Sequence, residues 1–177
     1  SWTDPIHSSN SSRSNLFECE GVDGWKSVDA DMTVEVLQAT GQNLYLMEAA
    51  PIDGPDSDCV WSNIDRILNS IDNSSSPIQT MTVMADYYNL SEYHEIINQT
   101  RQKANSHSGL FGVSVDDFSQ ALMKPIDLSQ GSGLTTSQVA ELHNSANSPN
   151  QNLPAVDFMP YLPAEALPLY YGDDTLM

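Results

Sequence analysis

Positive charge is the scarcest property of this 177-residue chain. It holds 6 lysines and arginines against 24 aspartates and glutamates, so its formal net charge is −18 and its isoelectric point lies near 4.1. A surface of that sign repels the phosphates of nucleic acids and of anionic membranes, and we expect neither as a partner. It suits cations or a salty, calcium-containing medium, although solubility alone also explains such a charge.

Several motifs of common enzyme classes are also missing. No apolar run approaches the roughly 20 residues of a membrane-spanning helix, so no span is predicted. The four histidines show no HxxxH or HExxH spacing, which argues against zinc. There is no G-x-S-x-G elbow and no Gly-rich phosphate loop. We expect no cofactor, with calcium as the one ion to consider, because the loop "DGPDSD" gathers Asp53, Asp56 and Asp58. That loop does not match the calcium-hand pattern, and a solvated turn is the simpler interpretation.

Cysteine is nearly absent, and its use bears on where the protein works. Cys19 and Cys59 either form one disulfide across a long loop or are both free. Asn-x-Ser/Thr sequons are slightly more frequent than chance predicts, and their acceptors are Asn10, Asn73, Asn89 and Asn98. With the even cysteine count and the acidic charge, they indicate a secreted, extracellular, N-glycosylated protein. In that setting we expect a Cys19–Cys59 disulfide that ties the N-terminal arm to the segment before the first helix.

The chain divides into an arm and one domain. Residues 1–28 form a Ser/Asn-rich segment that we expect to be an exposed arm, and residues 29–177 are enough for one domain with a sizeable core. The last residues, "LYYGDDTLM", follow an apolar cluster closely. This looks like an interruption of the domain at its C-terminal end.

Hydrophobic periodicity predicts alternating strands and helices. Strands are expected at 32–39, 43–52, 78–88, 110–115 and 155–163. The first two are close enough to form a hairpin, unless one of them is an edge strand. A helix over 59–71 has Val60, Ile64, Ile67, Leu68 and Ile71 on one stripe. Asn89 and Glu92 have the spacing of a capping box for the next helix, and Thr135 or Thr136 caps a later one. From residue 43 onward this order predicts an α/β fold with mainly parallel strands that are joined by crossovers and covered by helices.

Acidic residues follow four of these strands. In chain order, the acids at or just after the carboxyl ends of these strands are Glu48, Asp86, the adjacent Asp116 and Asp117, and Glu165. In a parallel sheet the carboxyl ends of the strands converge at one edge, where sites form. Each acid alone is also explained by helix capping or by solvation. Neighbouring strand residues point to opposite faces, so Asp116 and Asp117 are not expected to form a catalytic pair with each other. The favoured pair lies across two strands, Asp86 with Asp116 or with Asp117.

The segments "GVSVDDF", "ADYY" and "VDFMPYLP" resemble the first half of some glycoside-hydrolase-like (β/α) barrels. The resemblance implies that Asp116 or Asp117 is an acid/base or substrate-binding carboxylate, with Asp86 and Glu48 in the pocket. It also implies substrate contacts, which would come from Tyr87, Tyr88, Phe118, Tyr161 and Glu165. A whole barrel needs eight strand–helix units and about 250 residues. The strand–helix units that this chain lacks would come from the remainder of the natural polypeptide or from a neighbouring subunit.

Two functions follow as hypotheses. In the first, the chain is a secreted carbohydrate-active domain in which one carboxylic acid protonates the leaving oxygen and a second carboxylate attacks or activates water. In the second, it is a non-catalytic structural extracellular glycoprotein, a subunit of a filament or assembly whose partners are identical chains. The enzyme hypothesis predicts an open pocket with two carboxyls within about 10 Å. The structural hypothesis predicts a filled rim and large apolar contact patches.

Overall fold

The computed structural model describes residues 29–54, 57–74, 77–84, 88–116, 134–149 and 153–160. In these ranges the strands form one four-stranded parallel sheet in the sequential order β1-β2-β3-β4. The strands are β1 (Leu44–Glu48), β2 (Gln79–Met84), β3 (Leu110–Val115) and β4 (Asp157–Phe158). The predicted α/β class and the parallel direction of the strands are confirmed. The arm at 1–28 lies outside the described residues.

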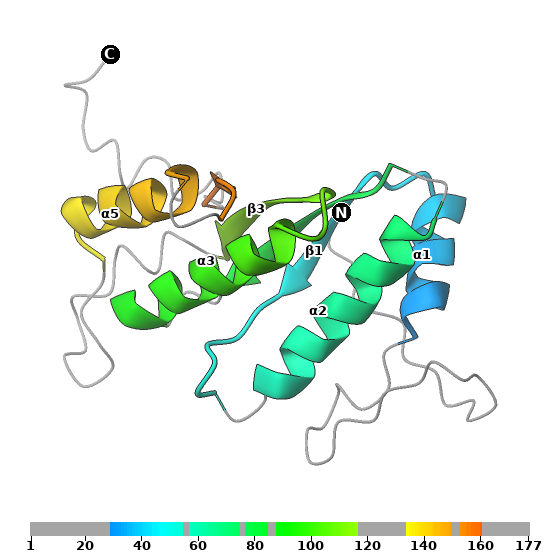
Figure 1. The fold of residues 1–177 in the computed structure, drawn as a ribbon, viewed down its shortest axis with the longest axis horizontal. Coiled ribbons are helices and arrows are strands. Elements are labelled where there is room, and N and C mark those ends of the chain that lie inside the picture. The colour runs from blue at the N-terminus through cyan, green and yellow to red at the C-terminus, as the bar shows by residue number, and fades with distance from the viewer. Residues whose placement is uncertain are drawn as a thin grey trace, which may run out of the picture.

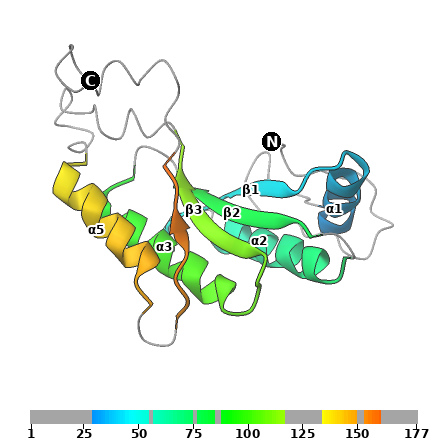
Figure 2. The same ribbon diagram turned by 90° about the horizontal axis from the view of Figure 1, so that it is seen from above.

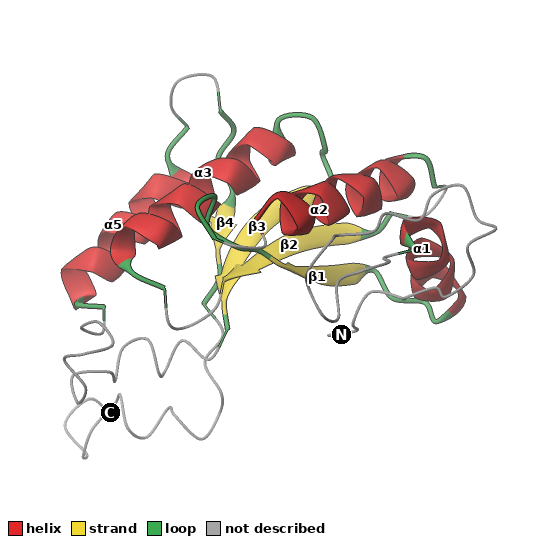
Figure 3. Cartoon of the chain, turned by 90° about the horizontal axis from the view of Figure 1, so that it is seen from below, coloured by secondary structure: helices red, strands yellow, loops and turns green. Residues whose placement is uncertain are grey.

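Helices cover one face of this sheet. They are α2 (Ser57–Asp72), α3 (Leu90–Ala104) and α5 (Thr136–Asn147). Helix α1 (Ala30–Ala39) packs against α2, and in Figure 1 the helices follow from right to left in the order α1, α2, α3, α5. Figures 2 and 3 show α2, α3 and α5 on the same side of the strands. A sequential parallel sheet with its crossover helices on one face is the arrangement of a (β/α) barrel, and the described strands form an open part of such a sheet.

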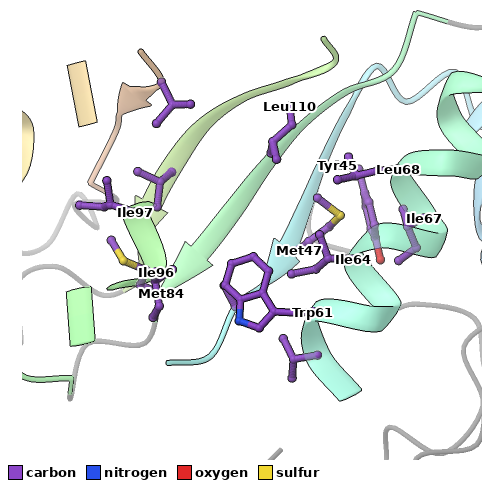
Figure 4. Packing of buried hydrophobic residues seen from close by; sticks show 14 of the residues in the cluster. Tyr45, Met47, Trp61, Ile64, Ile67, Leu68, Met84, Ile96, Ile97 and Leu110 are labelled. Carbon is purple, nitrogen blue, oxygen red and sulfur yellow. The ribbon is translucent and has the colours of Figure 1, made fainter. Parts of the chain in front are cut away.

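The core lies between the sheet and these helices. The predicted stripe of α2, Val60, Ile64, Ile67, Leu68 and Ile71, is buried throughout. Tyr45 and Met47 of β1 pack against this stripe (Figure 4). Each such side chain contributes about 1.5–3 kcal/mol relative to an exposed one. The hydrophobic contact between β1 and α2 therefore fixes the first crossover.

Capping residues begin the helices where the sequence predicts them. Asn89 accepts hydrogen bonds from the backbone N–H groups of Ser91 and Glu92, and the Glu92 carboxylate accepts one from the N–H of Asn89. The predicted capping box of α3 is therefore confirmed. At α5 the cap is Thr135 rather than Thr136, and Gln138 completes a second capping box.

The predicted strand at 32–39 is wrong, because these residues belong to helix α1. The buried residues of α1 are Ala30, Thr33, Val34 and Leu37, a helical spacing. Asp29 caps the helix by accepting a hydrogen bond from the N–H of Met32 at 2.9 Å. Val36 is 40% exposed, so the alternation of Met32, Val34 and Val36 misled the strand assignment.

The turn after α1 is a helix cap and not a hairpin. Gly41 has φ +69°, a conformation that glycine adopts readily. The N–H of Gly41 bonds to the carbonyl of Gln38, and the N–H of Gln42 bonds to that of Leu37. These two bonds define a Schellman motif, which ends α1 and directs the chain into β1.

Arg101 fixes the last crossover. This residue of α3 is 3% exposed, and its guanidinium donates four hydrogen bonds of 2.8–3.2 Å to backbone carbonyls. The acceptors belong to Ser145, Ser148, Leu153 and Pro154. Two of these carbonyls lie at the C-terminal end of α5, where the helix dipole favours a cation. Arg101 thereby joins α3, the end of α5 and the segment that leads into β4.

Candidate functional site

The strand residues alternate between the two faces of the sheet. Thr82 of β2 lies on the helix-covered face, because its hydroxyl bonds to that of Thr100 in α3 at 2.6 Å. Residues one step away in the strand therefore lie on the opposite face, here called the second face. The strand register places the following residues on the second face: Leu46, Glu48, Met81, Val83, Gly112, Ser114, Asp116 and Asp157.

Glu48 and Asp116 lie on the second face at the carboxyl-end edge of the sheet. Glu48 pairs with Val83, which pairs in turn with Ser114, and Asp116 follows two residues later. Both acids are exposed. With neighbouring strands about 4.8 Å apart and a rise of about 3.3 Å per residue, their Cα atoms are about 12 Å apart. The register thus brings together two of the acids that the sequence indicated.

Backbone hydrogen bonds hold both strand ends in place. The N–H of Ala49 donates to the carbonyl of Val83 at 2.8 Å, and that of Asp116 donates to the carbonyl of Met84 at 2.9 Å. Each of these bonds continues the sheet ladder past the end of a strand. Glu48 and Asp116 are therefore positioned by rigid backbone and not by a loose loop.

Aromatic side chains brace the segment that follows β1. The indole N–H of Trp61 donates to the carbonyl of Ala50 at 2.8 Å. The hydroxyl of Tyr88 donates to the carbonyl of Ala49 at 3.4 Å. Tyr88, which the resemblance implies as a substrate contact, is half-buried against the core and forms an edge-to-face pair with Tyr93 at 6.1 Å. In this position Tyr88 supports the rim of the sheet beside Glu48.

Asp157 is an acid that the sequence analysis missed. It is exposed on β4, on the second face, and its Cα pairs with Gly112. A Cβ at Gly112 would lie 3.0 Å from the carbonyl oxygen of Asp157 and 2.8 Å from Cε of Met81. A larger residue at this position would require Met81 and the β4 backbone to shift. The buried neighbours Val156 and Phe158 are a signal that could have identified Asp157, since an acid between two buried strand residues points to the other face.

Most other predicted site residues lie outside the described residues. These are Asp86, Asp117, Tyr87, Phe118, Tyr161 and Glu165. Asp86 follows β2 by two residues in the sequence, and β2 lies between the strands that end at Glu48 and Asp116. The cross-strand pair of Asp86 with Asp116 or Asp117 remains a prediction.

The calcium prediction involves three aspartates. Asp53 is exposed in the turn closed by the bond from the N–H of Gly54 to the carbonyl of Pro51, and Asp58 is exposed in the first turn of α2. Asp56 lies outside the described residues. Within those residues no group of three or more histidine, cysteine or acidic side chains is arranged to hold a metal ion. In the same part of the chain no helix has the length and apolarity to cross a membrane.

The predicted modification residues lie on the helices. Asn73, Asn89 and Asn98 are exposed, at the end of α2, at the N-cap of α3 and within α3. Cys59 is buried in α2 and disulfide-bonded. Its sulfur also accepts a hydrogen bond of 3.6 Å from the Asn63 amide. Asn10 and Cys19 lie outside the described residues, so the Cys19–Cys59 pairing remains a prediction.

Comparison with known proteins yields no relative. No protein-family description, no curated protein and no solved structure matches this chain. The site is therefore assessed from its own geometry.

Proposed function

We propose that this chain is a secreted carbohydrate-active domain of the glycoside-hydrolase-like (β/α) barrel type. The observation that supports the proposal best is the position of Glu48 and Asp116. Two exposed acids lie on one face of a parallel sheet, at the edge where sites form in such folds. A covering helix layer on the other face leaves these acids on the side that would line a barrel interior.

The proposal needs two carboxyls about 5–9.5 Å apart. The Cα atoms of Glu48 and Asp116 are about 12 Å apart, and their side chains add to or subtract from this distance. Asp86 follows β2, the strand between them, in the sequence and lies outside the described residues. In this proposal Asp86 and Asp116 act on the glycosidic bond as acid and as base or nucleophile. Glu48 and the more distant Asp157 contact the sugar hydroxyls.

The site would act without a metal ion. Proton transfer between carboxyls and a glycosidic oxygen requires no cofactor. The proposed substrate is a neutral or cationic carbohydrate, because an acidic one would be repelled by the chain's net charge. Calcium at the loop of Asp53, Asp56 and Asp58 would be structural.

An activity assay with charge-matched variants tests the proposal. The secreted protein is incubated with a panel of aryl glycosides and oligosaccharides, and released sugar is measured. Asp116→Asn should lower the rate by about 10²–10⁴-fold, the usual contribution of a general acid or base. Glu35→Gln removes the same charge from an exposed position on α1 and should leave the rate unchanged.

The rival function is an outcome of this experiment. If no substrate of the panel is cleaved by the full natural polypeptide, the hydrolase proposal fails. The structural glycoprotein then becomes the better hypothesis, and light scattering would show assemblies of identical chains. Equal rates for Asp116→Asn and Glu35→Gln would place any observed activity at another site.

A further inference from the structure

Asn89 uses only one end of its side-chain amide. Its Oδ1 accepts hydrogen bonds from the N–H of Ser91 at 3.0 Å, from the N–H of Glu92 at 3.1 Å and from the Ser91 hydroxyl at 2.6 Å. These bonds cap α3. The amide nitrogen Nδ2 makes no hydrogen bond to the described residues, and both Asn89 and Ser91 are exposed. The capping atom and the nitrogen are therefore available for separate roles.

The same residues form a sequon. Asn89, Leu90 and Ser91 match Asn-x-Ser/Thr, in which the asparagine nitrogen is glycosylated and the hydroxyl of the third residue is part of the acceptor. A sugar on Nδ2 leaves Oδ1 in place, since the amide carbonyl is kept in the product. Glycosylation here is thus compatible with the helix cap.

We infer that Asn89 is an N-glycosylation site whose glycan is attached beside an intact cap of α3. The inference rests on the secretion assumed in the proposed function. The donor is a lipid-diphosphate oligosaccharide, as in N-linked transfer. Nδ2 bonds to C1 of the first sugar, the C1–oxygen bond breaks, the lipid diphosphate leaves with the electron pair, and one amide proton passes to a base.

The neighbouring sequon differs in its hydroxyl. Asn98 is exposed within α3, but Thr100, the third residue of its sequon, is completely buried. The hydroxyl of Thr100 is also bonded to that of Thr82 at 2.6 Å. Once α3 packs on the sheet, this hydroxyl of the sequon is closed to a transferase. Asn89 keeps an accessible acceptor before and after folding, so its occupancy should exceed that of Asn98.

The fold puts the Asn89 glycan near the proposed site. Asn89 begins α3 directly after the β2–α3 connection, and such connections lie at the carboxyl-end edge of a parallel sheet. Asn73, by contrast, follows the end of α2 and lies toward the opposite edge. A glycan on Asn89 would therefore flank the edge that carries Glu48 and Asp116, on its helix side.

Expression of the full chain with a secretion signal in a glycosylating eukaryotic cell tests the inference. Enzymatic deglycosylation in ¹⁸O-water marks each occupied asparagine, and peptide mass spectrometry measures the marked fraction. Asn89→Asp keeps a good capping acceptor, and Ser91→Ala keeps Asn89 itself. Both variants should lose one glycan and, once all remaining glycans are removed enzymatically, unfold at the same temperature as the unmodified chain treated in the same way. Asn89→Ala should lose the glycan and also unfold at a lower temperature.

The outcomes separate this inference from the proposed function. A marked Asn89, occupied more fully than Asn98, supports the inference even if the protein hydrolyses nothing. An unmarked Asn89 in the secreted chain overturns it, even if the protein is an active hydrolase. Higher occupancy at Asn98 than at Asn89 also overturns it, because the buried Thr100 hydroxyl would then be no obstacle.

Discussion

Individual buried polar groups determine how tightly the helices are held to the sheet. Arg101 and Thr100 are buried residues of α3 and make hydrogen bonds to other elements. The partner of Thr100 is Thr82 of β2. A buried polar group that loses its partner destabilises the fold more than an exposed one, because water cannot replace the lost bond. Substitutions at these residues should therefore have large effects, although none touches the candidate site.

Arg101→Leu should lower the free energy of unfolding by about 3 kcal/mol, because it removes the donor of four partly buried carbonyls. Urea denaturation measures this change. Lys103→Met is a matched control on the same helix, since it removes a cation whose bond to Asp65 (2.6 Å) is partly exposed. Lys103→Met should lower the free energy of unfolding by less than about 1 kcal/mol. Equal losses for the two variants would contradict the role assigned to Arg101.

Thr100→Val should destabilise the protein by about 1–3 kcal/mol, because the hydroxyl of Thr82 is then buried without a partner. The double variant Thr82→Val/Thr100→Val removes both hydroxyls and should be more stable than the single variant. A double-mutant cycle by chemical denaturation in a non-glycosylating host measures the coupling. Additive losses would show that the two hydroxyls do not act as a pair.

The ends of elements were easier to predict than some of their interiors. Asn89 and Glu92 predict the start of α3, because the two side chains of a capping box bond to backbone N–H groups at a fixed spacing. The residues of α1 fit two periods at once, since Val34 belongs both to an alternating set and to a helical set. Burial of Leu37 and exposure of Val36 decide between these periods, and burial is a property of the folded chain.

Gly41→Ala should lower the free energy of unfolding by about 1 kcal/mol, because Gly41 has φ +69° in the Schellman motif. Among the described residues, apart from its chain neighbours, no atom lies within 4 Å of a Cβ built at this position, so the loss would come from the backbone and not from a clash. Gly41→Asn should cost less, since asparagine tolerates this conformation better. Thermal unfolding compares the two variants, and an equal loss for both would contradict the conformational explanation.

At the scale of the whole molecule, sequence alone could locate only part of the candidate site. Glu48 and Asp116 were identifiable because each ends an apolar segment, and parallel strands bring such ends to one edge. Their common face follows from the register, which depends on how β2 pairs with both neighbours. Asp157 was missed because its place beside Gly112 depends on the pairing of two distant segments. The local sequence pattern predicts where strands lie, whereas the pairing of these strands brings the site residues to one face of the sheet.

The net charge of −18 is also a property of the whole chain, and it should make stability depend on salt. Folding brings the acids closer together, so their mutual repulsion opposes the compact state. Salt screens this repulsion, since the Debye length falls from about 30 Å at 0.01 M to about 10 Å at 0.1 M. The unfolding temperature at pH 7 should therefore rise over this range of sodium chloride.

A charge-reduced variant provides the control for the salt effect. Glu35→Gln with Asp53→Asn removes two exposed acids and changes the net charge from −18 to −16. This variant should unfold at a higher temperature than the unmodified chain in low salt and respond less to added sodium chloride. A salt response that is the same in both proteins would mean that specific ion binding, and not general repulsion, governs the stability of this acidic fold.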